Sequence, residues 1–137
     1  SAYSPADGMA LSRHEAADVI NIKVSKYGLG DARRMAAVAE AASLPCMVGC
    51  MSETRLGLSP AAHLVSARPQ IIFADLDGAA GLEDDPVEGG MTYDAGRIEI
   101  PDRPGHGADI KPDVLNRLQG HAVTAQDNTP RPVPAGS

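Results

Sequence analysis

Segments with a helical pattern and segments with a strand pattern alternate three times within the first 77 residues. Ser4 and Pro5 favour a helix start, and the alanine-rich segment 31–43 carries an apolar stripe at helical spacing. We expect helices at residues 5–15, 31–43 and 61–67, and strands at residues 18–25, 46–51 and 70–75. This order predicts an α/β fold with parallel strands.

After residue 77 the alternation stops. Two short segments, 91–93 and 97–100, flank the turn residues 94–96 and predict a β-hairpin. From residue 120 onward proline, glycine and polar residues dominate, which is typical of a loose tail.

The composition excludes several classes of protein. The formal net charge is −6, which gives no basic surface for a nucleic-acid backbone. No apolar run approaches the roughly 18 residues of a membrane span. The first residues lack the pattern of a signal peptide, and 2 cysteines make no disulfide framework. We therefore expect a soluble, cytoplasmic protein that binds neither nucleic acid nor membrane.

The first predicted strand has one apolar and one polar face. Its apolar residues are Ile20, Ile22 and Val24, and its polar residues are Asn21, Lys23 and Ser25. A strand with one solvated side would explain this pattern. In a (β/α)8 barrel, however, the apolar face packs on the helices and the polar face points inward near the catalytic mouth. Asp75 and Asp77 project from one face at the end of the third strand, which favours the barrel.

A dinucleotide-binding fold is an alternative, because Gly28 and Gly30 lie between a predicted strand and a helix and Glu53 follows at the distance of a ribose-binding acid. Arg33 stands where the third glycine of that motif is required. The polar residues of the first strand also disagree with a strand that is buried on both faces. Both observations speak against this alternative.

Six short motifs occur in order along the chain. They are IKVSK at 22–26, MVGCMSET at 47–54, AAHL at 61–64, DLD at 75–77, GG at 89–90 and PDRPGHG at 101–107. Together they resemble the C-terminal part of the enolase superfamily, muconate-lactonizing subgroup, and most of all the dipeptide epimerases. The resemblance covers roughly residues 1–110.

The resemblance implies a fold that is larger than this chain. Residues 1–88 would form the last three strands, with their helices, of a TIM-like (β/α)7β barrel. Residues 89–118 would be a closing segment that returns toward a capping domain, and residues 119–137 a flexible tail. The three acidic Mg²⁺ ligands and one catalytic lysine would lie upstream, so we expect no metal ligand in this chain. We expect the chain to need its missing half, and to form homo-oligomers.

The resemblance also implies roles for individual residues. Lys23 matches the lysine of strand six, which exchanges the proton α to a substrate carboxylate held by Mg²⁺. Asp75 and Asp77 match the pair that binds the α-ammonium group of a dipeptide. The remaining substrate-binding residues would be Cys50, Met51 and Ser52, in the segment after strand seven. The implied activity is a dipeptide epimerase that the isolated chain would not perform.

Other interpretations of these residues stay open. Lys23 could reach solvent from a strand end, and the two aspartates could cap a turn. Cycloisomerisation, o-succinylbenzoate synthesis and N-acylamino-acid racemisation need the same lysine and Mg²⁺. A non-catalytic half-barrel or a partner subunit is a further alternative. The segment after Lys23 departs from the family pattern, because the Gly-Gly pair common in relatives is absent there.

Several polar residues receive no catalytic role. Cys46 and Cys50 would lie about 13 Å apart on one strand, too far for a disulfide. The acidic residues 83–85 are expected to be solvated. His63 is expected to pack or cap locally on its helix, and His106 is left unassigned.

Overall fold

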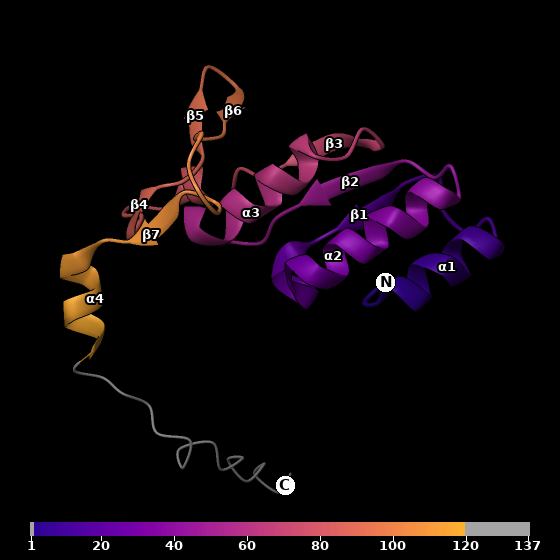
Figure 1. The fold of residues 1–137 in the computed structure, drawn as a ribbon, viewed down its shortest axis with the longest axis horizontal. Coiled ribbons are helices and arrows are strands. Elements are labelled where there is room, and N and C mark those ends of the chain that lie inside the picture. Colours follow the sequence, from indigo (N-terminus) through magenta and orange to yellow (C-terminus); the bar gives the residue numbers. More distant parts are fainter. Residues whose placement is uncertain (1, 120–137) are drawn as a thin grey trace, which may run out of the picture.

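The computed structural model describes residues 2–119 and consists of a parallel sheet with its helices, followed by a segment of short antiparallel strands (Figure 1). Its helices are α1 (Pro5–Arg13), α2 (Val24–Ala41), α3 (Arg55–Ser66), the 3-10 helix η1 (Gly78–Gly81) and α4 (Pro112–Gln119). Its strands are β1 (Ile20–Ile22), β2 (Cys46–Gly49), β3 (Ile71–Asp75), β4 (Val87–Gly89), β5 (Thr92–Asp94), β6 (Arg97–Glu99) and β7 (Ala108–Ile110).

The three strands β1, β2 and β3 form one parallel sheet in that order, which confirms the predicted α/β alternation. The register places Ile22 beside Val48 and Asn21 beside Met47. Ile22 and Val48 are fully buried, whereas Asn21 is exposed. One face of the sheet therefore carries the core, and the other carries polar and open positions.

The core lies between the sheet and the helices α2 and α3. It is built from small and aliphatic side chains, as the low aromatic content requires. The residues of the core cluster that are fully buried are Ile22, Ala32, Met35, Ala36, Ala39, Cys46, Val48, Leu58 and Met91. The helix α1 packs against α2 and begins with the predicted cap, in which the Ser4 hydroxyl accepts the N–H of Asp7.

The first strand is shorter than predicted and the second helix starts earlier. The strand ends at Ile22, Lys23 is the extended N-cap residue, and Val24 and Ser25 already belong to α2. The backbone N–H of Lys23 donates to the hydroxyl of Tyr27 at 2.9 Å, which supports the helix start from within its first turn. The alternating pattern continued into this turn, so the sequence overstated the strand.

Gly28 and Gly30, which the sequence placed between a strand and a helix, lie inside α2, and the helix is kinked at Gly28. Gly28 has a φ of 77°, and the chain continues as a helix on either side of it. Glycine tolerates this conformation, which explains how one helix can bend there without ending. The glycine pair thus lies within the helix rather than in a loop between strand and helix, as a dinucleotide-binding site would require.

The third helix begins at Arg55 instead of at residue 61, with Pro60 inside it. Ser59 is not its cap: the Ser59 hydroxyl donates to the carbonyl oxygen of Arg55 at 2.6 Å and is fully buried. A Ser-Pro pair commonly marks a helix start. Here the proline follows after more than one turn, so that prediction was wrong.

Residues after 77 form two small antiparallel pairs. The hairpin of β5 and β6 confirms the prediction, and its turn consists of Ala95 and Gly96, both with positive φ. The pairing of β4 with β7 and the helix α4 were not predicted. Of the predicted tail, residues 120–137 lie outside the described residues. No helix in the described part of the chain is long and apolar enough to span a membrane.

Candidate functional site

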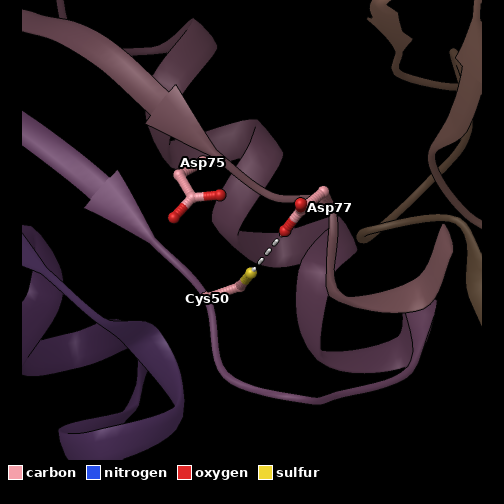
Figure 2. Close-up of side chains that lie close together, drawn as sticks. All are labelled: Cys50, Asp75 and Asp77. Carbon is pink, nitrogen blue, oxygen red and sulfur yellow. Dashed lines mark hydrogen bonds between the residues drawn. The ribbon is translucent and has the colours of Figure 1, made fainter. Parts of the chain in front are cut away.

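The carboxyl ends of the three parallel strands meet at one edge of the sheet and bring together the side chains that the sequence singled out. Asp75 ends β3, Asp77 follows it, and Cys50 comes directly after β2 (Figure 2). Their ligand atoms lie within 4.8 Å of one another, and the Cys50 thiol donates to Asp77 Oδ1 at 3.7 Å. Both aspartates are exposed and Cys50 is buried.

Lys23 reaches this cluster from the end of β1. Its Nζ donates to the carbonyl oxygen of Cys50 at 2.5 Å and lies 3.7 Å from the sulfur of Met51. Gly49 leaves the necessary space, because a Cβ on that residue would meet the side chains of Asn21 and Lys23. The ammonium group of Lys23 is therefore fixed over the β2 end, on the open face of the sheet.

The loop after β2 is held in place by close contacts. A Cβ on Gly78 would collide with the carbonyl oxygen of Met51, so only glycine permits this approach of the β3 end to the β2 loop. Within the loop, the N–H of Met51 donates to Glu53 Oε1 at 3.0 Å. Glu53 thus has a local role, and Ser52 lies in the same loop with an exposed side chain.

The two cysteines are free thiols whose pKa values are raised. Burial raises the pKa of Cys46 to about 11. Burial is also the main cause of the raised pKa of Cys50, with the carboxylates of Asp75 and Asp77 acting in the same direction and the N–H of Gly78 against it. A neutral thiol between two carboxylates avoids a third negative charge, so Cys50 serves here as a hydrogen-bond donor.

The described residues do not fit a Mg²⁺ site. Mg²⁺ requires near-octahedral coordination by oxygen. In residues 2–119 the group of potential ligands at this edge combines two exposed carboxylates with a thiol that burial keeps protonated. Lys23, whose Nζ contacts the carbonyl oxygen of Cys50, supplies no oxygen ligand either.

Polar residues outside the predicted set also shape this region. Arg55 donates to Asp85 Oδ2 at 2.6 Å, so the prediction that the acidic segment 83–85 is solvated was wrong for Asp85. The hydroxyl of Tyr93 donates to the carbonyl oxygen of Leu76 at 2.6 Å. No local sequence pattern marks these partners, because they are 17 and 30 residues apart in the chain.

Residues without a predicted catalytic role lie elsewhere. Lys26 sits over the ring of Tyr3, with its Nζ 5.4 Å from the ring centre. His106 accepts the N–H of Ala108 through Nδ1 at 3.3 Å, which is a local contact. The Nε2 of His63 is buried and has no hydrogen-bond partner in the described structure.

Comparison with known protein families gives a match over most of the chain. The family model described as "Enolase C-terminal domain-like" matches residues 1–114. Among curated proteins, the L-Lys-D/L-Arg epimerase of Methylococcus capsulatus is 42% identical over 109 residues, which cover 78% of this chain and 31% of that protein. Muconate cycloisomerase 1 of Rhodococcus opacus is 30% identical over 117 residues, which cover 84% of this chain and 31% of that protein.

Solved structures agree with the sequence comparison. The dipeptide epimerase of Cytophaga hutchinsonii, complexed with Mg and the dipeptide D-Ala-L-Val, superposes with a TM-score of 0.81 at 36% identity. The match covers 85% of this chain and 32% of that structure. The chain thus spans about 30% of the length of the relatives that it matches.

Proposed function

Because the chain belongs to the enolase C-terminal domain-like family and is the C-terminal part of its (β/α)7β barrel, we propose that it supplies one half of the active site of a dipeptide epimerase. The observation that carries the proposal is that Cys50 contacts both sides: Lys23 donates to its carbonyl oxygen, and its thiol lies with Asp75 and Asp77. A base after β1 and an ammonium-binding pair at the end of β3, with the β2 end between them, suit a substrate with both an acidic α-proton and a free amine.

In this proposal Lys23 exchanges a proton with the α-carbon of the substrate. Its neutral amine would accept the α-proton from one face, and a second lysine outside this chain would return a proton to the other face. The result is inversion at the α-carbon with no net change in atoms. The contact of Nζ with the carbonyl oxygen of Cys50 supports this role, because it holds the amine in one position.

Asp75 and Asp77 would bind the substrate ammonium group. Two carboxylates that project toward the same space offer charge-assisted hydrogen bonds to a group with three N–H donors. Cys50, Met51 and Ser52 would line the path of the substrate between Lys23 and the aspartates. Both the geometry of the loop and the exposure of Met51 are compatible with this placement.

We further propose that the complete enzyme uses Mg²⁺ through ligands that lie outside this chain. The solved relative from Cytophaga hutchinsonii is complexed with Mg, whereas the residues described above do not fit a Mg²⁺ site. Every step assigned to this chain therefore concerns binding and proton transfer by its own side chains.

The partner of this chain would be the remaining part of the barrel. The strand β3 is at the edge of the sheet and exposes Ile72 and Phe73, each 55% accessible. An exposed apolar edge strand favours pairing with another strand. We propose residues 1–88 as barrel, 89–118 as closing segment and 119–137 as tail, in a cytoplasmic homo-oligomer. A stable monomer of the isolated chain that melts cooperatively would contradict the need for this partner.

The test of the proposed function is proton exchange in deuterated water by the complete polypeptide, which carries this chain and the rest of its barrel. Lys23→Ala should lower exchange at the α-carbon of a dipeptide by a factor of roughly 10² to 10⁴. Lys26→Ala is the matched control, since Lys26 contacts Tyr3 instead of the site. Undiminished exchange at both faces in Lys23→Ala would remove Lys23 from the mechanism.

A second candidate is another reaction of the same superfamily, which the match to a muconate cycloisomerase favours. Cycloisomerisation, o-succinylbenzoate synthesis and N-acylamino-acid racemisation act on substrates without a free α-ammonium group. The pair Asp75 and Asp77 favours the dipeptide. Turnover of an N-acylated amino acid in preference to the free dipeptide would support the alternative. Absence of turnover by the complete polypeptide with Mg²⁺ would support a non-catalytic half-barrel.

A further inference from the structure

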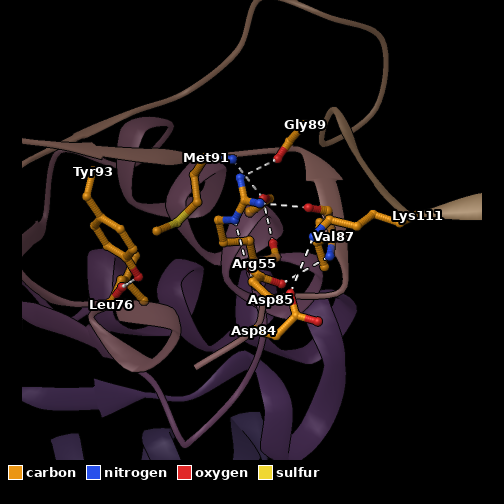
Figure 3. Close-up of polar contacts among 10 residues, drawn as sticks. Arg55, Leu76, Asp84, Asp85, Val87, Gly89, Met91, Tyr93 and Lys111 are labelled. Atoms are coloured by element: carbon orange, nitrogen blue, oxygen red, sulfur yellow. Dashed lines mark hydrogen bonds and ion pairs between the residues drawn. The ribbon is translucent and has the colours of Figure 1, made fainter. Parts of the chain in front are cut away.

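The closing segment contacts the candidate site through Tyr93. This residue lies in β5, 16 residues after Asp77, and its hydroxyl donates to the carbonyl oxygen of Leu76 (Figure 3). Leu76 is the residue between Asp75 and Asp77, and its side chain is buried. The hydrogen bond of 2.6 Å thus holds the backbone between Asp75 and Asp77 in place.

Tyr93 is itself held by an anchor on α3. The N–H of Met91, two residues before it, donates to the buried hydroxyl of Ser59 at 2.9 Å, and the Met91 side chain is fully buried. Arg55, on the same helix, donates to the carbonyl oxygens of Val87 and Gly89 at 2.7 and 2.9 Å. Figure 3 shows Arg55 with Val87 and Gly89 to the right of Met91, and Tyr93 with Leu76 to its left.

Gly90 lets the closing segment come this near to the helix. Gly90 has a φ of 73°, and a Cβ there would press on the Ser59 hydroxyl and on Ala108. Its N–H donates to the carbonyl oxygen of Gly107 at 2.8 Å. The residues just before Tyr93 are therefore fixed by contacts with α3 and with the residue before β7.

The environment of the Tyr93 hydroxyl agrees with a role as a neutral donor. Burial raises the pKa of Tyr93, the backbone of Ala79 acts against this rise, and the charges of Cys50, Asp77 and Asp85 act with it. Since a phenol that stays protonated donates to a carbonyl oxygen, the link to Leu76 persists over the neutral pH range.

We propose that Tyr93 is a positioning residue that fixes the spacing and direction of Asp75 and Asp77, so that recognition of the substrate ammonium group depends on the closing segment. This inference rests on the proposed function. Tyr93 acts through the Leu76 peptide and does not need to touch the substrate. Its loss should weaken binding of a free ammonium group while leaving proton transfer at Lys23 intact.

The experiment is a comparison of Tyr93→Phe with the unchanged complete polypeptide, using a dipeptide and its N-acetylated form. For the free dipeptide we expect KM to rise about three- to ten-fold with kcat nearly unchanged, as for the loss of one hydrogen bond. The preference for the free amine over the acetylated form should fall by the same factor. In an Asp77→Asn background the effect of Tyr93→Phe should largely vanish, because both changes act on one pair.

Tyr3→Phe is the matched control, since Tyr3 is exposed and its ring is contacted by Lys26. An equal fall in kcat for both substrates, or a full additive effect in the Asp77→Asn background, would indicate a general structural role and overturn the inference. Hydrogen exchange of residues 75–79 gives a readout without turnover, and unchanged exchange in Tyr93→Phe would also overturn it. If the unchanged polypeptide epimerises no dipeptide, the proposed function fails, while the exchange measurement still decides whether Tyr93 holds this segment.

Discussion

The parallel sheet of β1, β2 and β3 and the segment of β4 to β7, which adds Val87 and Glu88 to the proposed closing segment and is called by that name below, are stabilised in different ways. The sheet places its buried residues in a continuous apolar layer against α2 and α3, with Ile22 and Val48 fully buried. The closing segment exposes most of its strand residues, and β5 is exposed throughout. It is attached by two buried side chains, Val87 and Met91, and by polar contacts to α3.

This difference separates the part of the molecule that carries the site residues from the part that fine-tunes their positions. The sheet ends carry Lys23 and Asp75, and their positions depend on packing that many residues share. The closing segment touches the site through the hydrogen bond of Tyr93 to Leu76. Changes in the sheet should therefore affect the whole fold, and changes in the closing segment should act locally.

The largest effect is expected from a cavity in the sheet. Ile22→Ala removes a fully buried side chain from β1 and should destabilise the fold by about 2–5 kcal/mol. Because the cavity lies in the shared core, amide hydrogen exchange should accelerate in all three strands of the sheet. Leu118→Ala, at an exposed position of α4, should leave it unchanged. Acceleration confined to β1 would mean that the sheet does not behave as one cooperative unit.

Removing the main polar anchor of the closing segment should have a smaller and more local effect. Arg55→Met loses the ion pair with Asp85 and the contacts to Val87 and Gly89, and it leaves a partly buried carboxylate unpaired. We expect a cost of about 2–4 kcal/mol for closing β4 and β7 onto α3.

The measurement is hydrogen exchange of β4 and β7 compared with β1 and β2 in the complete polypeptide. Exchange should accelerate in the closing segment alone. Arg117→Met is the control, because Arg117 forms an exposed pair with Asp113 within α4. Equal acceleration in both regions would contradict the division between them.

Alkaline pH should weaken the sheet before it weakens the attachment of the closing segment. The folded state raises the pKa of Cys46, a buried residue of β2, from 9.0 to about 11. A group with a raised pKa contributes its full stability below its unfolded pKa and loses it as the pH rises to its folded pKa. The free energy of unfolding should thus fall by about 2–3 kcal/mol between pH 9 and pH 11 on account of this thiol.

Denaturant unfolding at pH 8, 9, 10 and 11 measures this loss. Cys46→Val keeps an apolar side chain of similar size and should flatten the profile between pH 9 and 11. Tyr27 and Tyr93 also have raised pKa values from burial, so a smaller decline remains in the variant. A profile identical to that of the unchanged chain would show that the pKa of Cys46 does not differ between the folded and unfolded states.

The sequence predicted the sheet well because its signals are local. Apolar alternation in β1, alanine-rich spacing in α2 and the aspartates after β3 each lie within a few residues. The predicted boundaries were less accurate where a strand pattern runs into a helix, as at Lys23. They were also less accurate at α3, where Pro60 suggested a helix start but Thr54 is the N-cap residue. Short antiparallel pairs such as β4 with β7 depend on residues about 20 positions apart, which no local pattern reveals.

The same reasoning explains what could be foreseen of the candidate site. Lys23, Cys50, Asp75 and Asp77 were selected from a resemblance in ordered motifs, and parallel strands bring their ends together. Tyr93 was not selected, because its relation to Leu76 depends on how the closing segment returns to the sheet. Because every residue has a backbone carbonyl, a hydrogen bond to one leaves no recognisable pattern in the sequence around it.

The smallest expected effect is a gain in stability confined to the β5–β6 hairpin. Its two-residue turn places Ala95 at a φ of 44° and Gly96 at 83°, the left-handed conformation that asparagine and glycine accept more readily than alanine. Ala95→Asn should therefore stabilise the hairpin by about 0.5–1 kcal/mol, and Ala95→Val should destabilise it, because a β-branched side chain resists positive φ. Hydrogen exchange at Tyr93 and Ile98, which pair across the hairpin, should slow in the first variant and quicken in the second, with β1, β2 and β3 unaffected. If the sheet responds as strongly as the hairpin, the closing segment is not a separate local unit and Tyr93 cannot adjust the aspartates independently of the core.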